Sequence, residues 1–426
     1  MSSKKLRVLH LFENYLLTAQ NWAFRMMDNF EETENFVCAY KYRNVHFVTD
    51  DIHLLELPDY VTPEIISESR NVSSSHGSNV LSFFKKKYYQ SKFINYVASE
   101  IKRLQIDVIH CHFANIGWHF LPLKKITGLP FIVSFYGFDY ESLPYSFPVW
   151  KRRYQQMFKD ADMFICEGPH GAEILKKYGC AERKIKVVHL GVDFAKAPSI
   201  SRFKNPDELS LIQIGNLGEK KGHIYSLKAF AKALKECPNM NLTLIGDGYQ
   251  NIRESLEKFV AEHHLADKVH FEKHVPSYHL YEILKIYQVF IHPSCYAENR
   301  DCEGGAPIVL LDAQATGMPV ISTNHCDIPE EVIHNKTGLL SGEKDVDALA
   351  ESITYFYKMK NNEYVQFAQN AREHVHRNFD VENTSKKMEA VYFSIKGKKY
   401  SSAGYVQLLA AASAAAFIFI MWMRFR

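Results

Sequence analysis

Short apolar runs alternate with stretches of helical periodicity through most of the chain. The apolar runs read RVLHLF, DVIHCHF, PFIVSFYG, MFICEG and KIKVVHLG in the first half, and LSLIQIG, LTLIGDG, VHFEKHV, VFIHPS, PVISTN and TGLLSG after residue 207. Alternation of strands and helices is typical of parallel sheets with helices on both faces. The series is interrupted once, at the polar, proline-containing stretch FAKAPSISRFKNPDELS. We therefore predict an α/β fold with two Rossmann-like domains that face each other across a cleft.

These patterns divide the chain into ranges. The predicted units are a first domain at 1–195, a linker at 196–207, a second domain at 208–375, a C-terminal helix at 376–395 and a hydrophobic helix at 404–423. In open parallel sheets, ligands bind at the carboxyl ends of the strands, where helix N-termini also point. Substrates are therefore expected in the cleft.

The hydrophobic segment at 404–423 meets the length rule for a membrane span. Between Gly404 and Met423, Gln407 and Ser413 are the strongly polar residues, and a helix of this length spans a hydrocarbon core of roughly 30 Å. Lysines and a tyrosine precede it, and a tryptophan and arginines end it, as interfacial anchors do. The alternative is a helix that packs on the protein body or lies in the membrane interface. We favour a C-terminal anchor.

Composition narrows the class of protein. Apolar residues make up 46% and charged residues 23%, as in ordinary globular proteins. The net charge of +3 is too weak for a dedicated nucleic-acid binder, so no nucleic-acid partner is expected. The 8 cysteines form no CxxC pair, which indicates neither a zinc site nor a disulfide framework and fits a reducing cytosol. The N-terminal MSSKKLRVLHLF does not have the pattern of a signal peptide.

The segment CEGGAPIVLLDAQATGMPVIS at 302–322 places a carboxylate, two glycines and a proline before a nearly continuous apolar run. Pro307 suits the first residue of a helix, since its missing N–H has no intrahelical partner there. Apolar residues on all sides of this helix predict that it is buried. Asp312 interrupts the run, and a buried carboxylate must be matched by hydrogen-bond donors.

Two further loops carry glycines. LIQIGNLGEKKGHIYSLKAF reads as a strand, a loop with glycines and lysines, and a helix that begins near His223. Such a loop could hold a phosphate through backbone amides and lysine, or could equally be a solvated connection. LIGDGYQN supplies Gly246 and Gly248 but not the third glycine of a dinucleotide fingerprint, so we reject a nicotinamide-binding function.

Together these stretches resemble a known family. GNLGEKKG, LIGDG, EGGAP with the following Asp312, GMPVIST and NKTGLLSG appear in this order in the retaining glycosyltransferases of family 4, which have the two-domain GT-B fold. DVIHCHF, PFIVSFYGFD and KVVHLGVD are similar to the corresponding stretches of the family's first domain. The resemblance covers about residues 5 to 395, and the loop at 301–330 is most similar to bacterial exopolysaccharide and colanic-acid-type members. It also implies that the helix at 376–395 returns to the first domain.

The resemblance implies roles for individual residues. The implied catalytic residues are Glu303, Lys221, Tyr136 and His112, and the implied donor-binding residues are Gly215, Asn216, Lys220, Gly246, Gly304, Gly305, Ala306 and Asp312. In the family, the first acid of a paired-acid motif contacts hexose hydroxyls and the second contacts the ribose diol; Glu303 and Asp312 match them, with one extra residue between them and a shorter second acid. Lys221 matches a lysine that contacts the diphosphate.

This chain departs from the family at two further positions. Asn216 stands where an arginine is usual, and Lys220 is expected to compensate in part, although lysine cannot form a bidentate fork. Tyr136 stands where the family often has a histidine near the hexose; it can still donate a hydrogen bond. His110 and His112 share one face of a strand end. We favour a role in the cleft for His112 over a metal site, because two histidines without a nearby carboxylate are a poor ligand set.

The resemblance implies a metal-independent, retaining hexosyltransferase without a cofactor, acting at the cytoplasmic face of the inner membrane. It moves a hexose from a nucleotide-diphosphate sugar to a glycan or lipid-linked glycan in cell-surface polysaccharide synthesis. The segments FFKKKYYQSKF and WKRRYQQMF would contact anionic lipid or form solvated helix faces. The alternatives are a non-catalytic subunit that binds sugar nucleotides, and an epimerase or phosphorylase of the same fold.

Overall fold

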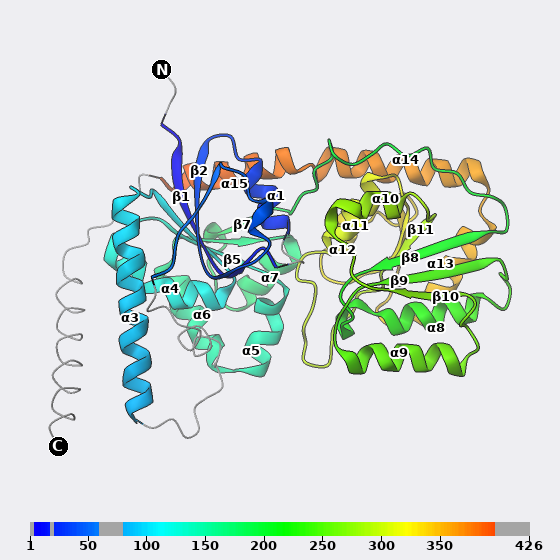
Figure 1. The fold of residues 1–426 in the computed structure, drawn as a ribbon, viewed down its shortest axis with the longest axis horizontal. Coiled ribbons are helices and arrows are strands. Elements are labelled where there is room, and N and C mark those ends of the chain that lie inside the picture. The colour runs from blue at the N-terminus through cyan, green and yellow to red at the C-terminus, as the bar shows by residue number, and fades with distance from the viewer. Residues whose placement is uncertain (1–3, 18–20, 59–79, 397–426) are drawn as a thin grey trace.

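The computed structural model describes residues 4–17, 21–58 and 80–396, and these residues form two α/β lobes (Figure 1). In the described residues, the sheet of the first lobe has the order β3 (Ile52–Leu54), β2 (Thr33–Tyr42), β1 (Leu6–Tyr15), β4 (Val108–His112), β5 (Phe131–Phe135), β6 (Met163–Cys166) and β7 (Ile185–Val187). The second sheet has the order β10 (Val269–Glu272), β9 (Met240–Ile245), β8 (Leu209–Ile214), β11 (Val289–Ile291), β12 (Val320–Thr323) and β13 (Gly338–Ser341). All strand pairs within both sheets are parallel, which confirms two parallel-sheet domains.

The central strands are buried on both faces, and most of their side chains are apolar. In β4 and β5 every residue is buried, and β-branched and aromatic side chains suit such positions. The helices of the first lobe are α1 (Asn21–Asp28), α3 (Val80–Arg103), α4 (Ala114–Thr127), α5 (Leu143–Ser146), α6 (Val149–Asp160) and α7 (Pro169–Lys177). They cover two apolar cores, one on each face of the sheet.

The second lobe is built in the same way. Its helices are α8 (His223–Ala233), α9 (Gln250–Glu262), α10 (Leu280–Leu284), α11 (Ile308–Ala315), α12 (Ile328–Glu331), α13 (Val346–Lys358) and α14 (Asn361–Asn378). Helix α8 begins at His223, as the glycine loop predicts. Helix α11 begins at Ile308, one residue after the expected start, because Pro307 is extended, with ψ of 115°, and caps the helix instead.

The chain returns to the first lobe through α15 (Val381–Ile395), which follows α14 along one side of the molecule (Figure 1). Met388, Tyr392 and Ile395 of α15 join the apolar core that contains β1 and α1. The helical segments differ from the expected ranges: α14 continues to Asn378, beyond the domain end expected at 375, and the returning helix begins at Val381 rather than at 376.

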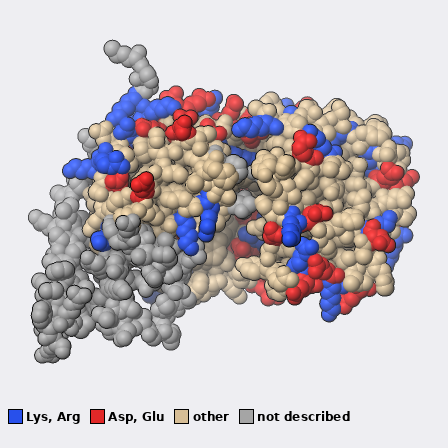
Figure 2. Space-filling view, in the orientation of Figure 1, with Lys and Arg blue, Asp and Glu red and all other residues tan. Residues whose placement is uncertain are grey.

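The hydrophobic helix predicted at 404–423 lies outside the described residues. Among the helices within 4–17, 21–58 and 80–396, none has both the length and the apolar character of a membrane span. On the face shown in Figure 2, acidic and basic side chains of the described residues are interspersed over both lobes. This agrees with the small net charge of the chain.

Candidate active site

Glu303 and Lys221 meet at the carboxyl edge of the second sheet. Strands β8 and β11 are neighbours in this sheet, so the loops that follow them leave the same edge. Lys221 Nζ lies 2.7 Å from Glu303 Oε2, and Ser294 Oγ donates to Glu303 Oε1 at 2.9 Å. Burial disfavours the charged form of Glu303, but Lys221, His292 and Lys220 together outweigh burial, and the pKa of the carboxyl lies well below its usual range. Glu303 is therefore a carboxylate at neutral pH.

Lys220 anchors the segment that precedes Glu303. Its Nζ lies 3.2 Å from Asp301 Oδ1 and donates to the Cys302 carbonyl at 2.9 Å. Burial opposes the charge on Lys220, yet the nearby Glu303 and Asp301 raise its pKa above the usual value. Asn216 is exposed in the same loop and brings no charge to the site. Both loop lysines are thus paired with carboxylates of the neighbouring loop.

Glycines let the backbones of the two lobes and of neighbouring loops approach closely. A Cβ on Gly304, whose φ is +85°, would lie 2.2 Å from the backbone nitrogen of Gly137 in the first lobe. A Cβ on Gly246 would lie 2.0 Å from the Gly215 carbonyl oxygen. No side chain fits at such distances. The structure therefore brings the Glu303 loop against the peptide that follows Tyr136, and packs Gly215 against Gly246.

Asp312 lies inside α11 and is 2% exposed. Its Oδ1 accepts hydrogen bonds from Arg25 Nη1 at 3.0 Å and from the Tyr281 hydroxyl at 2.9 Å. Arg25 belongs to α1 of the first lobe, so this buried ion pair crosses between the lobes. The donors that the sequence requires for Asp312 are supplied here by an arginine and a tyrosine. A ribose contact of Asp312 stays a prediction.

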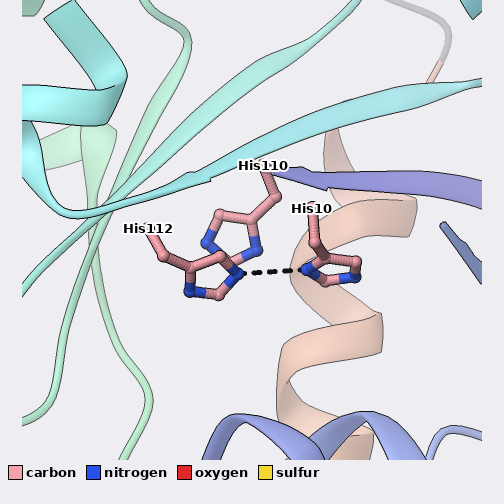
Figure 3. A group of neighbouring side chains, drawn as sticks. All are labelled: His10, His110 and His112. Carbon is pink, nitrogen blue, oxygen red and sulfur yellow. Dashed lines mark hydrogen bonds between the residues drawn. The ribbon is translucent and has the colours of Figure 1, made fainter. Parts of the chain in front are cut away.

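His112 and Tyr136 lie together in the first lobe, where a third histidine joins them. The Tyr136 hydroxyl is 2.8 Å from His112 Nδ1, and His112 Nε2 is 3.1 Å from His10 Nδ1 (Figure 3). His10, on β1, also contacts Asn35 Oδ1 at 3.3 Å through Nε2. His110, on β4 with His112, bonds Tyr392 and Ser134 at 2.8 and 2.7 Å.

Ligand atoms of these three buried histidines lie within 4.8 Å of one another, which is close enough for a metal ion. Each of their ring nitrogens has a hydrogen-bond partner, and burial lowers the pKa of all three, to about 4 for His10. The three histidines therefore form one buried hydrogen-bonded network in their neutral form. Its Tyr136 end lies beside the Glu303 loop.

Two acidic groups that sequence reasoning missed form hydrogen bonds between the lobes. Glu167 follows β6, and its Oε2 accepts a hydrogen bond from the Gly305 amide at 3.1 Å. Burial raises the pKa of Glu167 to about 8, so the group is largely protonated at neutral pH. Asp327 accepts a hydrogen bond from the His170 amide at 2.7 Å, and burial raises its pKa to about 6. In the sequence, Glu167 could have been recognised as a candidate because it directly follows a predicted strand.

Two parallel-sheet domains that meet at the carboxyl ends of their strands are the arrangement of the GT-B fold. Residues 51–196 match the family model Glycosyltransferase Family 4, and residues 198–374 match Glycosyl transferases group 1. The chain belongs to the glycosyltransferases that these two models describe.

Curated relatives agree with this assignment, and solved structures agree with the fold. WcaL of Escherichia coli, named as a colanic acid biosynthesis glycosyltransferase, is 27% identical over 76% of this chain and 80% of its own length. AmsK of Erwinia amylovora, named for amylovoran biosynthesis, is 28% identical over 60% of this chain and 62% of its own. A glycosyltransferase from Rickettsia africae superposes with a TM-score of 0.71 over 92% of this chain and 99% of that one, at 17% identity. Anabaena HepE in complex with UDP-glucose superposes with a TM-score of 0.67 over 91% of this chain and 100% of that one, at 15% identity.

Proposed function

We propose that this glycosyltransferase is a retaining hexosyltransferase that moves a hexose from a nucleotide-diphosphate sugar to a glycan or lipid-linked glycan in exopolysaccharide synthesis. The observation that carries the proposal is the ion pair of Glu303 and Lys221 at the carboxyl edge of the second sheet. A carboxylate that is held ionised can accept hydrogen bonds from hexose hydroxyls, and the adjacent ammonium can neutralise a departing phosphate. The names of WcaL and AmsK support an acceptor of the exopolysaccharide class.

In this proposal the protein positions both substrates and stabilises charge. The donor lies along the second domain, with its hexose at Glu303 and its ribose near Asp312. Lys221, Lys220 and the amide of Gly304 face the diphosphate, and the Gly305 amide joins them once it leaves its hydrogen bond with Glu167. The acceptor hydroxyl attacks the face that the nucleotide leaves, and a donor phosphate oxygen takes its proton. Catalysis then comes mainly from orientation and electrostatic stabilisation.

The donor assay uses UDP-glucose, UDP-N-acetylglucosamine and GDP-mannose, with release of the nucleoside diphosphate and NMR of the product as readouts. We expect turnover with one of these donors, an anomeric configuration identical to that of the donor, and full activity in a strong chelator. An inverted product contradicts retention. Activity that is lost in chelator and restored by one divalent metal contradicts the metal-independent mechanism.

The proposed site of action is the cytoplasmic face of the membrane. The sequence at 404–423 is apolar enough for an anchor, and Lys151 and Arg152 lie exposed on α6 beside the exposed Val149. The full-length chain and a version that ends at Ser402 are fractionated and washed with high salt and then alkaline carbonate. Full-length protein that carbonate releases contradicts a spanning anchor. A truncated chain that binds membranes in low salt and leaves in high salt supports a separate basic contact.

A further inference from the structure

Arg25 is a cationic residue at the contact between the two lobes, and neither the motifs nor the resemblance assigns it a role. It extends from α1 of the first lobe, its side chain is 15% exposed, and its guanidinium contacts Asp312 of the second lobe. Burial alone would lower its pKa, but Asp312, Tyr281 and Asp193 together outweigh burial and raise the pKa of Arg25, so the guanidinium stays charged. A buried arginine at an interdomain cleft calls for an explanation, because isolated buried charge is costly.

The charges around the cleft show what Arg25 contributes. Lys221 is paired with Glu303, Lys220 with Asp301, and Asp312 with Arg25. Asp193, which also acts on Arg25, is paired with Lys196. Each of these pairs is neutral. With Arg25 removed, the same set of groups would carry an excess negative charge, and an incoming diphosphate would be repelled.

We propose that Arg25 is a donor-binding residue that reaches across the cleft to the diphosphate of the nucleotide sugar. The inference rests on the proposed function, in which the donor runs from its hexose at Glu303 to its ribose near Asp312. The diphosphate then lies between these two carboxylates, and Arg25 stands at the Asp312 end on the opposite wall of the cleft. An arginine has five N–H donors in a fork that matches phosphate oxygens.

This role complements the second-domain loop. Asn216 in that loop is exposed and uncharged, and both loop lysines are already paired with carboxylates, so a cation from the first lobe would add to the charge that faces the diphosphate. A cation supplied by the first lobe contacts the donor while both lobes are together. Donor binding would therefore favour the closed arrangement of the lobes, since Arg25 gains the diphosphate only across the cleft.

The test compares nucleoside diphosphates with monophosphates, because a structural role of Arg25 would affect both alike. Affinities of wild type and Arg25→Gln are measured calorimetrically for UDP, GDP and ADP and for UMP, GMP and AMP. For the nucleobase whose diphosphate binds the wild-type protein, we expect Arg25→Gln to lower the affinity for the diphosphate at least about tenfold. This is the loss expected for one charge-assisted hydrogen bond. The affinity for the corresponding monophosphate should change less than about threefold.

Controls separate charge from folding. Arg25→Lys should retain part of the diphosphate affinity, and Asn216→Arg in the Arg25→Gln background should restore some of it, because both return a cation to the site. Arg7→Gln is the matched control, because Arg7 pairs with Glu34 at 2.8 Å within the first lobe. It should leave nucleotide affinity unchanged. The melting temperature of Arg25→Gln reports the cost of removing the Arg25–Asp312 ion pair, and those of the other variants are the comparison.

The outcomes are distinct. Equal losses of affinity for diphosphate and monophosphate overturn the inference. A higher diphosphate affinity in Arg25→Gln also overturns it, because Arg25 would then only occupy Asp312 and hinder binding in the empty site. Wild-type protein that binds none of these nucleotides, and turns over none of the sugar nucleotides, refutes the proposed function itself and the inference with it.

Discussion

The substitution Glu303→Gln tests the central ion pair most directly. The side chain of Glu303 is 5% exposed and that of Lys221 is 19% exposed, and their charged atoms lie 2.7 Å apart. Removal of one partner of a fully buried pair costs about 3–5 kcal/mol, because the other charge stays buried. Since Lys221 is partly hydrated, we expect a loss of about 2 kcal/mol in the free energy of unfolding.

Turnover should fall at least about tenfold in Glu303→Gln, which corresponds to about 1.4 kcal/mol of transition-state stabilisation. Unfolding in urea and release of the nucleoside diphosphate measure the two effects on the same preparation. The double variant Glu303→Gln with Lys221→Met should recover stability but not turnover, because it removes the orphaned charge together with the function. Glu298→Gln, an exposed acid of the same loop, is the control.

The pair also has a signature in the pH dependence of stability. The pKa of Glu303 is lowered in the folded protein. Its contribution to the free energy of unfolding is therefore fully present above the pKa of the unfolded chain, and it is lost as pH falls through the pKa of the folded protein. Glu303→Gln should lack this loss in acid. Normal turnover and wild-type acid stability in Glu303→Gln would refute both the site assignment and the electrostatic argument.

Two further predictions concern contacts between the lobes. In Gly137→Ala, the new Cβ would lie 2.2 Å from the Cys302 carbonyl oxygen, so the lobes must separate. We expect turnover to fall and the free energy of unfolding to drop by about 1–3 kcal/mol. An unchanged enzyme would show that this contact is dispensable. Gly342→Ala, where the nearest atom is 3.8 Å away, is the control. The raised pKa of Glu167, about 8 against 4.5, means that the folded state binds more protons between these values, so stability falls as pH rises through that window. Glu167→Gln should flatten this part of a plot of melting temperature against pH, and an unaltered slope would contradict the burial argument.

The sequence alone determined the features that depend on local order along the chain. Alternation of apolar runs and helical patterns predicted two parallel-sheet domains, because the side-chain periods of strands and helices are local properties. The glycine loop predicted a helix at His223, and the apolar run predicted a buried helix around Asp312. Glu303 and Lys221 could be named because the loops that carry them resemble those of the glycosyltransferase family, although the sequence did not show that they form an ion pair.

The tertiary structure decided which groups from distant segments meet. Arg25 and Asp312 are 287 residues apart, and Glu167 and Gly305 are 138 apart. No local period or motif links such residues, because their contact depends on how two separately folded lobes pack. The same holds for His10, whose hydrogen bond to His112 arises because β1 and β4 are neighbours in the sheet. Local sequence thus specifies the loops of the site, while the packing of the lobes determines the charges that those loops face.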